Sequence, residues 1–224
     1  SLPKYINKEE FDVRIMLPKY LALPESYKAQ MKYLTHFYMD LAWRNQYVGV
    51  YQLNFDGITF YFIDNEYYFE GSTPYGNIYE DIEKFAFFSK AALSILPLLD
   101  FKPDIIHCHD WQTGLLPVYL KDKFQEENFY KEIKTVFTIH NLKFQGVWNV
   151  NTVKDITGLS EYYFTPDKLE AYGDANYLKG GIVYSDFVTT VSETYANEIK
   201  TPFFGEGLDG LINARSNFLE GIIN

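Results

Sequence analysis

Three short apolar segments of this chain end in polar side chains of the types that enzymes use. The segments end in His107-Cys108-His109-Asp110-Trp111, Thr138-Ile139-His140-Asn141 and Thr190-Val191-Ser192-Glu193. Imidazole and carboxylate groups can transfer protons, orient a ligand or stabilise charge that develops during a reaction. Asp, Asn and Ser also cap helix N-termini, so capping is the plainer alternative for Asp110, Asn141 and Ser192. A buried strand has little use for imidazoles unless they are hydrogen-bonded or lie at its end, so the histidines make the first two segments the candidate site.

A metal centre is one chemistry that these histidines could support. His107 and His109 are two residues apart, so in a strand both side chains would lie on the same face. If His140 approached them, the three imidazoles and Asp110 could bind zinc or iron for metal-dependent hydrolysis. The spacing gives weak support, because the chain has only four histidines and a two-metal centre needs more ligands. We keep this His-x-His hydrolase as the lesser alternative and predict no metal.

The elements that must position these side chains are strands alternating with helices. Apolar runs without polar alternation predict strands buried on both faces of a parallel sheet, over residues 104–109, 135–140 and 187–191. Apolar residues at helical spacing predict helices over residues 79–99, 112–123, 175–184 and 193–200. In an open parallel sheet, ligands bind beyond the carboxyl ends of the strands. We therefore expect the polar tips to meet in one site.

A hairpin precedes this alternating region. Apolar residues over 48–55 and 58–63 flank Asp56-Gly57, a pair that suits the positive φ angles of a tight turn. A further strand is predicted over residues 12–17, and no strand is predicted from there to the hairpin. The expected fold is α/β, a Rossmann-like, doubly wound and mostly parallel sheet with this antiparallel hairpin added at an edge. No dinucleotide or P-loop glycine pattern follows any strand.

Composition narrows the classes of partner. The chain of 224 residues has 47% hydrophobic residues and a net charge of −10, so a sizeable core can form and binding to nucleic acid is disfavoured. No apolar run approaches the ~20 residues needed to span a bilayer, so we expect no membrane partner. Cys108 is the only cysteine, which excludes an intrachain disulfide and suits a reducing compartment. We expect a soluble, cytoplasmic protein.

Eight segments that run in order along the chain resemble the glycogen and starch synthase family. They lie at Ser1–Ile6, Ser72–Gly76, Glu83–Leu93, Lys102–Leu120, Val136–Trp148, Asn176–Ile199, Gly205–Ile212 and Leu219–Asn224. The longest include "KPDIIHCHDWQTGLLPVYL" and "VFTIHNLKFQGVW". The resemblance implies a retaining glucosyltransferase that moves glucose from ADP-glucose or UDP-glucose to the non-reducing end of an α-1,4-glucan, with no metal or other cofactor.

The resemblance also implies a GT-B enzyme, in which the active site lies between two Rossmann-like domains. Residues 1–224 would form a single truncated N-terminal domain on the acceptor side. The first βα unit and the C-terminal nucleotide-binding domain would be absent, so we expect this fragment alone to be inactive. Its expected partners are the nucleotide-sugar donor, the α-glucan acceptor and the missing C-terminal domain.

Site residues follow from the matching motifs. The resemblance implies that His140 lies beside the donor sugar, and that Asp110 positions the acceptor or shapes the catalytic pocket. Trp111 would stack on an acceptor sugar or, as we slightly favour, pack internally. The substrate-binding candidates are Tyr75, Trp111, Asn141, Gln145 and Asn224. The other functions that stay open are another GT-B enzyme, such as a sucrose synthase or a phosphorylase relative, and a carbohydrate-binding module without catalysis.

Overall fold

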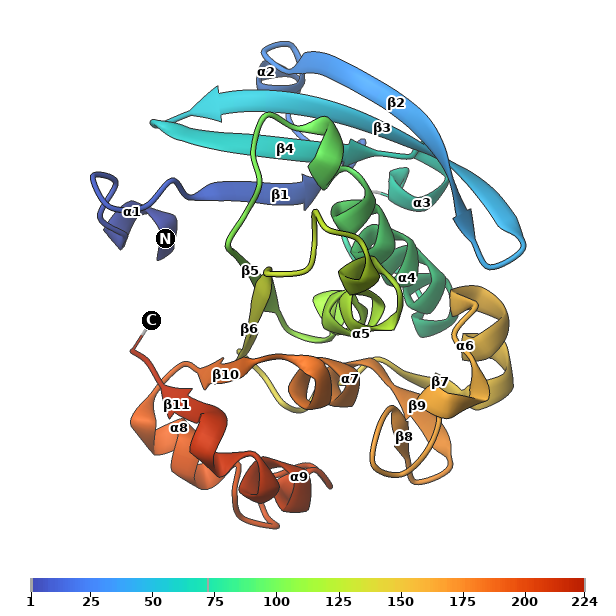
Figure 1. Ribbon diagram of the computed structural model, residues 1–224, viewed down its shortest axis with the longest axis vertical. Helices are drawn as coiled ribbons and strands as arrows, with labels where there is room; N and C mark the ends of the chain where they lie inside the picture. The colour runs from blue at the N-terminus through green and yellow to red at the C-terminus, as the bar shows by residue number, and fades with distance from the viewer. Residues whose placement is uncertain (1, 72, 224) are drawn as a thin grey trace.

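A computed structural model describes residues 2–71 and 73–223, and Figure 1 shows an α/β arrangement of helices and three sheets. The parallel sheet has the order β11-β10-β6-β5, with bounds Leu219–Gly221, Phe187–Thr190, Lys134–Ile139 and Ile105–His109. All three pairings are parallel. The α/β fold class and the three strands expected from the apolar runs are therefore confirmed.

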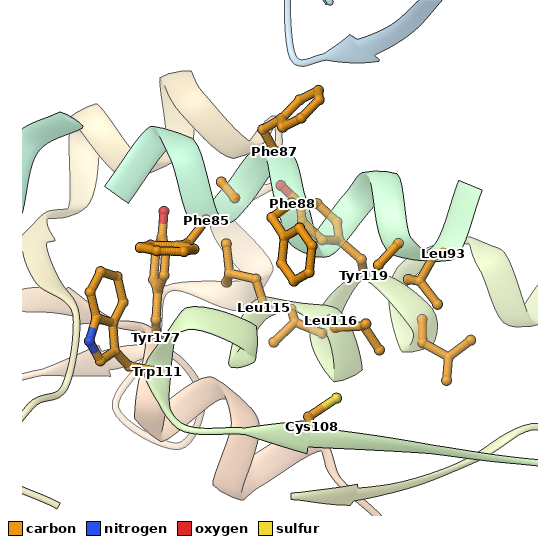
Figure 2. Packing of buried hydrophobic residues seen from close by; sticks show 14 of the residues in the cluster. Phe85, Phe87, Phe88, Leu93, Cys108, Trp111, Leu115, Leu116, Tyr119 and Tyr177 are labelled. Atoms are coloured by element: carbon orange, nitrogen blue, oxygen red, sulfur yellow. The ribbon is translucent and has the colours of Figure 1, made fainter. Parts of the chain in front are cut away.

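The two faces of the parallel sheet differ in chemistry. On one face, Cys108 and Phe137 are buried beneath the helices α5 (Leu115–Asp122) and α7 (Tyr177–Tyr184), and Figure 2 shows Cys108 beside Leu116. A Cβ added to Gly181 of α7 would lie 2.8 Å or less from three Phe137 ring atoms, so only glycine permits this close packing. The opposite face carries the histidines of β5 and polar residues of its neighbours.

The second sheet contains the predicted hairpin. Its order is β1-β4-β3-β2, with bounds Arg14–Pro18, Ile58–Asp64, Arg44–Phe55 and Lys32–Leu41. Asp56 and Gly57 adopt φ angles of 53° and 70°, which confirms the tight turn between β3 and β4. Within the described residues this hairpin belongs to its own sheet and pairs with no strand of the parallel sheet. The sequence predicts no strand over residues 32–41, and this prediction is wrong, because the structure shows the strand β2 there.

Helix α4 (Ile78–Ser94) connects the two sheets. It lies between the second sheet, which is mixed because β1 pairs with β4 in parallel, and α5 (Figure 1), and nearly all of its apolar side chains are buried. Asn77 caps it by accepting a hydrogen bond from the Glu80 backbone N–H at 3.0 Å. Most residues from Asp81 to Leu93 are buried around the helix, so α4 lies at the centre of the core (Figure 2).

The remaining elements are short. The third sheet has the order β7-β9-β8, with bounds Val147–Asn149, Asp174–Asn176 and Glu170–Ala171. The other helices are α1 (Leu2–Tyr5), α2 (Glu25–Lys28), α3 (Glu66–Phe69), α6 (Val150–Thr157), α8 (Glu193–Glu198) and α9 (Asp209–Ala214). Among residues 2–71 and 73–223, none of the helices has the length and apolarity required to cross a membrane.

Candidate active site

The tips that follow β5 and β6 meet at the carboxyl edge of the parallel sheet. The register of the two strands places His109 opposite Thr138, so Asp110 and His140 both follow at this edge. An oxygen of the Asp110 carboxylate, Oδ1, accepts a hydrogen bond from the backbone N–H of His140 at 2.7 Å. A longer bond of 3.4 Å comes from the N–H of Asn141. The expected meeting of Asp110 and His140 is confirmed.

Asp110 has an unusual backbone conformation. Its φ of 56° and ψ of −176° lie in a region that is almost reserved for glycine and that costs other residues about 1–3 kcal/mol. The Asp110 N–H donates to the carbonyl of Thr138 at 3.0 Å, and the Thr113 hydroxyl donates to the carbonyl of His109 at 2.9 Å. Asp110 makes no capping bond to the 3₁₀ helix that follows it, Trp111–Thr113. These contacts hold the tip of β5 against the tip of β6.

The polar face of the sheet carries a connected group of rings and hydroxyls. His109 Nδ1 and His140 Nε2 lie 3.0 Å apart, which is hydrogen-bonding distance. The His107 and His109 rings pack with centroids 4.2 Å apart, and His107 Nε2 lies 2.6 Å from the Thr138 hydroxyl. Thr138 in turn contacts the Thr189 hydroxyl at 2.5 Å. The histidine side chains therefore form one ordered cluster at the end of β5 and β6.

Protonation of the β5 histidines is disfavoured. Desolvation lowers the pKa of His109 to about 4, and the neighbouring imidazoles of His107 and His140 act in the same direction. Desolvation and His140 also lower the pKa of His107. Both residues are exposed at the open edge of β5, so solvent weakens the effect of burial. The direction is nevertheless the same for both rings, and it favours their neutral forms.

Trp111 lies under the site rather than on its surface. It is only 6% exposed, and its ring packs edge-on against Phe85 with centroids 5.2 Å apart. Gly146, with a φ of 64°, lies so close that an added Cβ would come within 3.0 Å of the indole. Figure 2 shows Trp111 beside Tyr177. These contacts correspond to the packing role that we favour for Trp111.

The other predicted site residues take different positions. Asn141 is exposed, and its side-chain oxygen accepts a hydrogen bond from the N–H of Lys143 at 3.1 Å. Gln145 uses its amide for the carbonyls of Leu142 and Glu206, so it connects this loop to residues 205–210. Tyr75 is 58% exposed, and its ring centroid lies 6.3 Å from that of Phe85. Asn224 lies outside the described residues.

Two alternative chemistries find little support in the geometry. Within residues 2–71 and 73–223, no group of three or more His, Cys, Asp or Glu residues is arranged to hold a metal ion. Cys108 is buried on the opposite face of the sheet, and burial raises the pKa of its thiol to about 12, so it is no nucleophile at neutral pH. Ser192 caps α8 through a bond from the Tyr195 N–H at 3.0 Å. Its capping alternative is confirmed.

The sequence predicts no role for His109 in the preferred site, although the structure places its ring against His140. The available signal is its position at the last residue of an apolar strand, two residues after His107 and on the same face. Its contact with His140 depends on the two strands being neighbours in register. That pairing becomes visible only in the structure.

Comparison with solved structures defines the class of this fold. The catalytic domain of starch synthase IV from Arabidopsis thaliana, solved with ADP and acarbose bound, superposes with a TM-score of 0.89 at 30% identity. The match covers 97% of this chain and 45% of that chain. The chain thus has the α/β fold of one part of a GT-B starch synthase catalytic domain.

Sequence comparison defines the family. The profile of the starch synthase catalytic domain matches residues 1–214, and the chain belongs to this family. The glycogen synthase of Lachnospira eligens is 70% identical over all 224 residues, and that of Lachnoclostridium phytofermentans is 69% identical. In each case the match covers 47% of the relative. The chain spans about half the length of the curated relatives it matches.

Proposed function

We propose that this chain is the acceptor-side half of a retaining glucosyltransferase that extends α-1,4-glucan from ADP-glucose or UDP-glucose. The observation that carries the proposal is the junction of Asp110 and His140 at the carboxyl edge of the parallel sheet. This is the edge at which open α/β sheets bind ligands. Further support comes from relatives named glycogen synthase and from a structural neighbour bound to ADP and acarbose.

His140 is the proposed catalytic residue on this half of the cleft. Loss of the nucleoside diphosphate leaves an oxocarbenium-like sugar, and groups that match its developing charge lower the barrier. His140 is partly exposed at the end of β6, where its ring can contact the donor sugar and stabilise that charge. The chemistry needs cations at the diphosphate, and we assign these to the half of the enzyme that lies outside this chain.

The proposed role of Asp110 is to position His140 through the backbone of the His140 loop. Its carboxylate bonds the N–H groups of the His140 loop, so it sets the position of His140. Trp111 supports the loop from beneath. Asn141 and Tyr75 are the exposed candidates for contacts with the glucan, and Asn224 stays a candidate on sequence grounds alone. Gln145 orders the loop through its two carbonyl contacts.

Residues 1–224 are proposed to act as one domain of a two-domain enzyme in the cytoplasm, where a single cysteine suits the reducing conditions. The donor, the glucan and a nucleotide-binding domain are its proposed partners. Because the phosphate-binding groups are assigned to the second domain, the isolated chain should transfer little or no glucose.

A chimera tests this function. In what we call the synthase chimera, this chain replaces its matching segment in the glycogen synthase of Lachnospira eligens. The proposal predicts transfer of radiolabelled glucose from ADP-glucose or UDP-glucose to glycogen, and none by the isolated chain. A folded chimera that transfers no glucose would contradict it. Transfer only from glucose-1-phosphate would favour a phosphorylase relative, and glucan binding without transfer would favour a binding module.

A further inference from the structure

His140 is held at two points, and they come from neighbouring residues of β5 and its tip. The backbone N–H of His140 bonds the carboxylate of Asp110 at 2.7 Å. The ring of His140 approaches the ring of His109, with Nε2 and Nδ1 3.0 Å apart and the ring planes inclined by 40°. One contact fixes the backbone, and the other restricts rotation of the side chain.

His109 is itself well placed for this task. Its backbone N–H donates to the Thr113 hydroxyl at 2.7 Å, and the same hydroxyl donates to its carbonyl. Its ring packs on His107, which is bonded to Thr138 of β6. A side chain held on its backbone and on one ring face can transmit its orientation to the residue that it contacts.

The contact also determines which atoms of His140 remain available. Two neutral imidazoles can share a hydrogen bond only when one facing nitrogen carries the proton and the other does not. The bond therefore couples the tautomers of the two rings, because the ring that donates at this contact and the ring that accepts must differ. With Nε2 occupied, Nδ1 is the free ring nitrogen of His140, and no hydrogen bond to it comes from residues 2–71 or 73–223.

We propose that His109 is a positioning residue, which holds the His140 ring through its Nδ1–Nε2 hydrogen bond and leaves Nδ1 of His140 to face the donor sugar. This inference rests on the proposed function for the identity of the sugar. The pairing of the two rings itself rests on the structure alone. The two parts can therefore be tested separately.

The kinetic test uses the synthase chimera with two substitutions of His109. His109→Leu keeps bulk but removes the hydrogen bond, whereas His109→Asn retains a polar atom near the position of Nδ1. A misplaced catalytic group can cost about 100-fold in rate, so we expect His109→Leu to lower kcat about 10- to 100-fold with little change in KM for glycogen. His109→Asn should recover most of that loss. His36→Leu, on β2 of the other sheet, is the matched control and should retain wild-type kcat.

Equal kcat values for His109→Leu and wild type would overturn the proposal, and so would equal losses in His109→Leu and His109→Asn. A second measurement does not depend on turnover. Nitrogen-15 NMR of labelled histidines in the 224-residue chain should show that the tautomer populations of His140 differ between the wild type and His109→Leu, because the substitution removes the partner nitrogen. Identical tautomer populations in the two proteins would overturn the proposal even if the chimera were active. If the wild-type chimera transferred no glucose, the proposed function would fail, and the NMR result would still decide the role of His109.

Discussion

Substitutions of Asp110 test the account, because Asp110→Gly should be more stable to unfolding than Asp110→Ala. At most positions alanine is the more stable of the two. Asp110→Ala removes the carboxylate that bonds His140 and keeps a side chain at a φ of 56°. Asp110→Gly removes the same carboxylate but relieves the backbone strain. A hydrogen bond to a charged group contributes about 1.5–3 kcal/mol, and here the 2.7 Å bond dominates because the bond from Asn141 is 3.4 Å long. Since the site is partly open to water, we expect Asp110→Ala to lower the free energy of unfolding by about 2 kcal/mol.

For Asp110→Gly the loss should be about 1 kcal/mol, because relief of strain at positive φ exceeds the entropic cost of glycine. Urea unfolding of the chain, followed by circular dichroism, measures both values, provided the m-values stay constant. Asp104→Ala is the control, since Asp104 is exposed just before β5 and its side chain bonds none of the described residues. An Asp110→Ala protein as stable as Asp110→Gly, or both variants within about 0.5 kcal/mol of wild type, would refute the reasoning.

Two further predictions concern packing and pH. Gly181→Ala should lower the free energy of unfolding by about 1–3 kcal/mol, because the new methyl group overlaps the Phe137 ring. Phe137→Leu should reduce that cost in a double-mutant cycle, and additive losses would contradict the proposed clash. The folded-state pKa values of His107 and His109 lie below the ordinary 6.5. The neutral rings therefore contribute their full stability above pH 6.5, and this contribution is lost as the pH falls. For His109 the loss extends down to its folded-state pKa of about 4. Thermal melts should therefore show a smaller fall in Tm over this range for His109→Asn than for wild type, and equal falls would count against the neutral pair.

The parallel sheet was predictable because its strands are short apolar runs, but the expected burial on both faces holds only for β6 and β10. It is wrong for the edge strand β5, where Ile105, His107 and His109 are exposed. The strands β5, β6 and β10 are short apolar runs, and their polar tips must meet wherever such strands lie side by side.

By contrast, β2 was missed although Phe37, Met39 and Leu41 alternate with exposed residues over its second half. A bulge between Tyr33 and Thr35 shifts the phase of the pattern in its first half, so the strand does not read as one alternating run.

The sequence predicted which residues lie at the site, but it predicted less well what each of them contacts. Asp110 matches both a helix cap and a catalytic carboxylate in the sequence, yet it bonds the backbone of a residue 30 positions further along the chain. That partner depends on the register of two strands, which local patterns do not specify. The same holds for His109 and His140, which share a hydrogen bond across the sheet. Trp111 is different, because its burial follows from the apolar residues around it.

The most direct test of the proposed function is the turnover of the synthase chimera with His140→Ala. If His140 stabilises the charge that develops on the donor sugar, kcat should fall by about 100-fold or more, as is typical when one such stabilising group is removed. The Tm should stay within a few degrees of wild type, because the Asp110 bond reaches the His140 backbone, which alanine retains. A folded His140→Ala chimera with near-normal turnover would contradict the proposed role of this site.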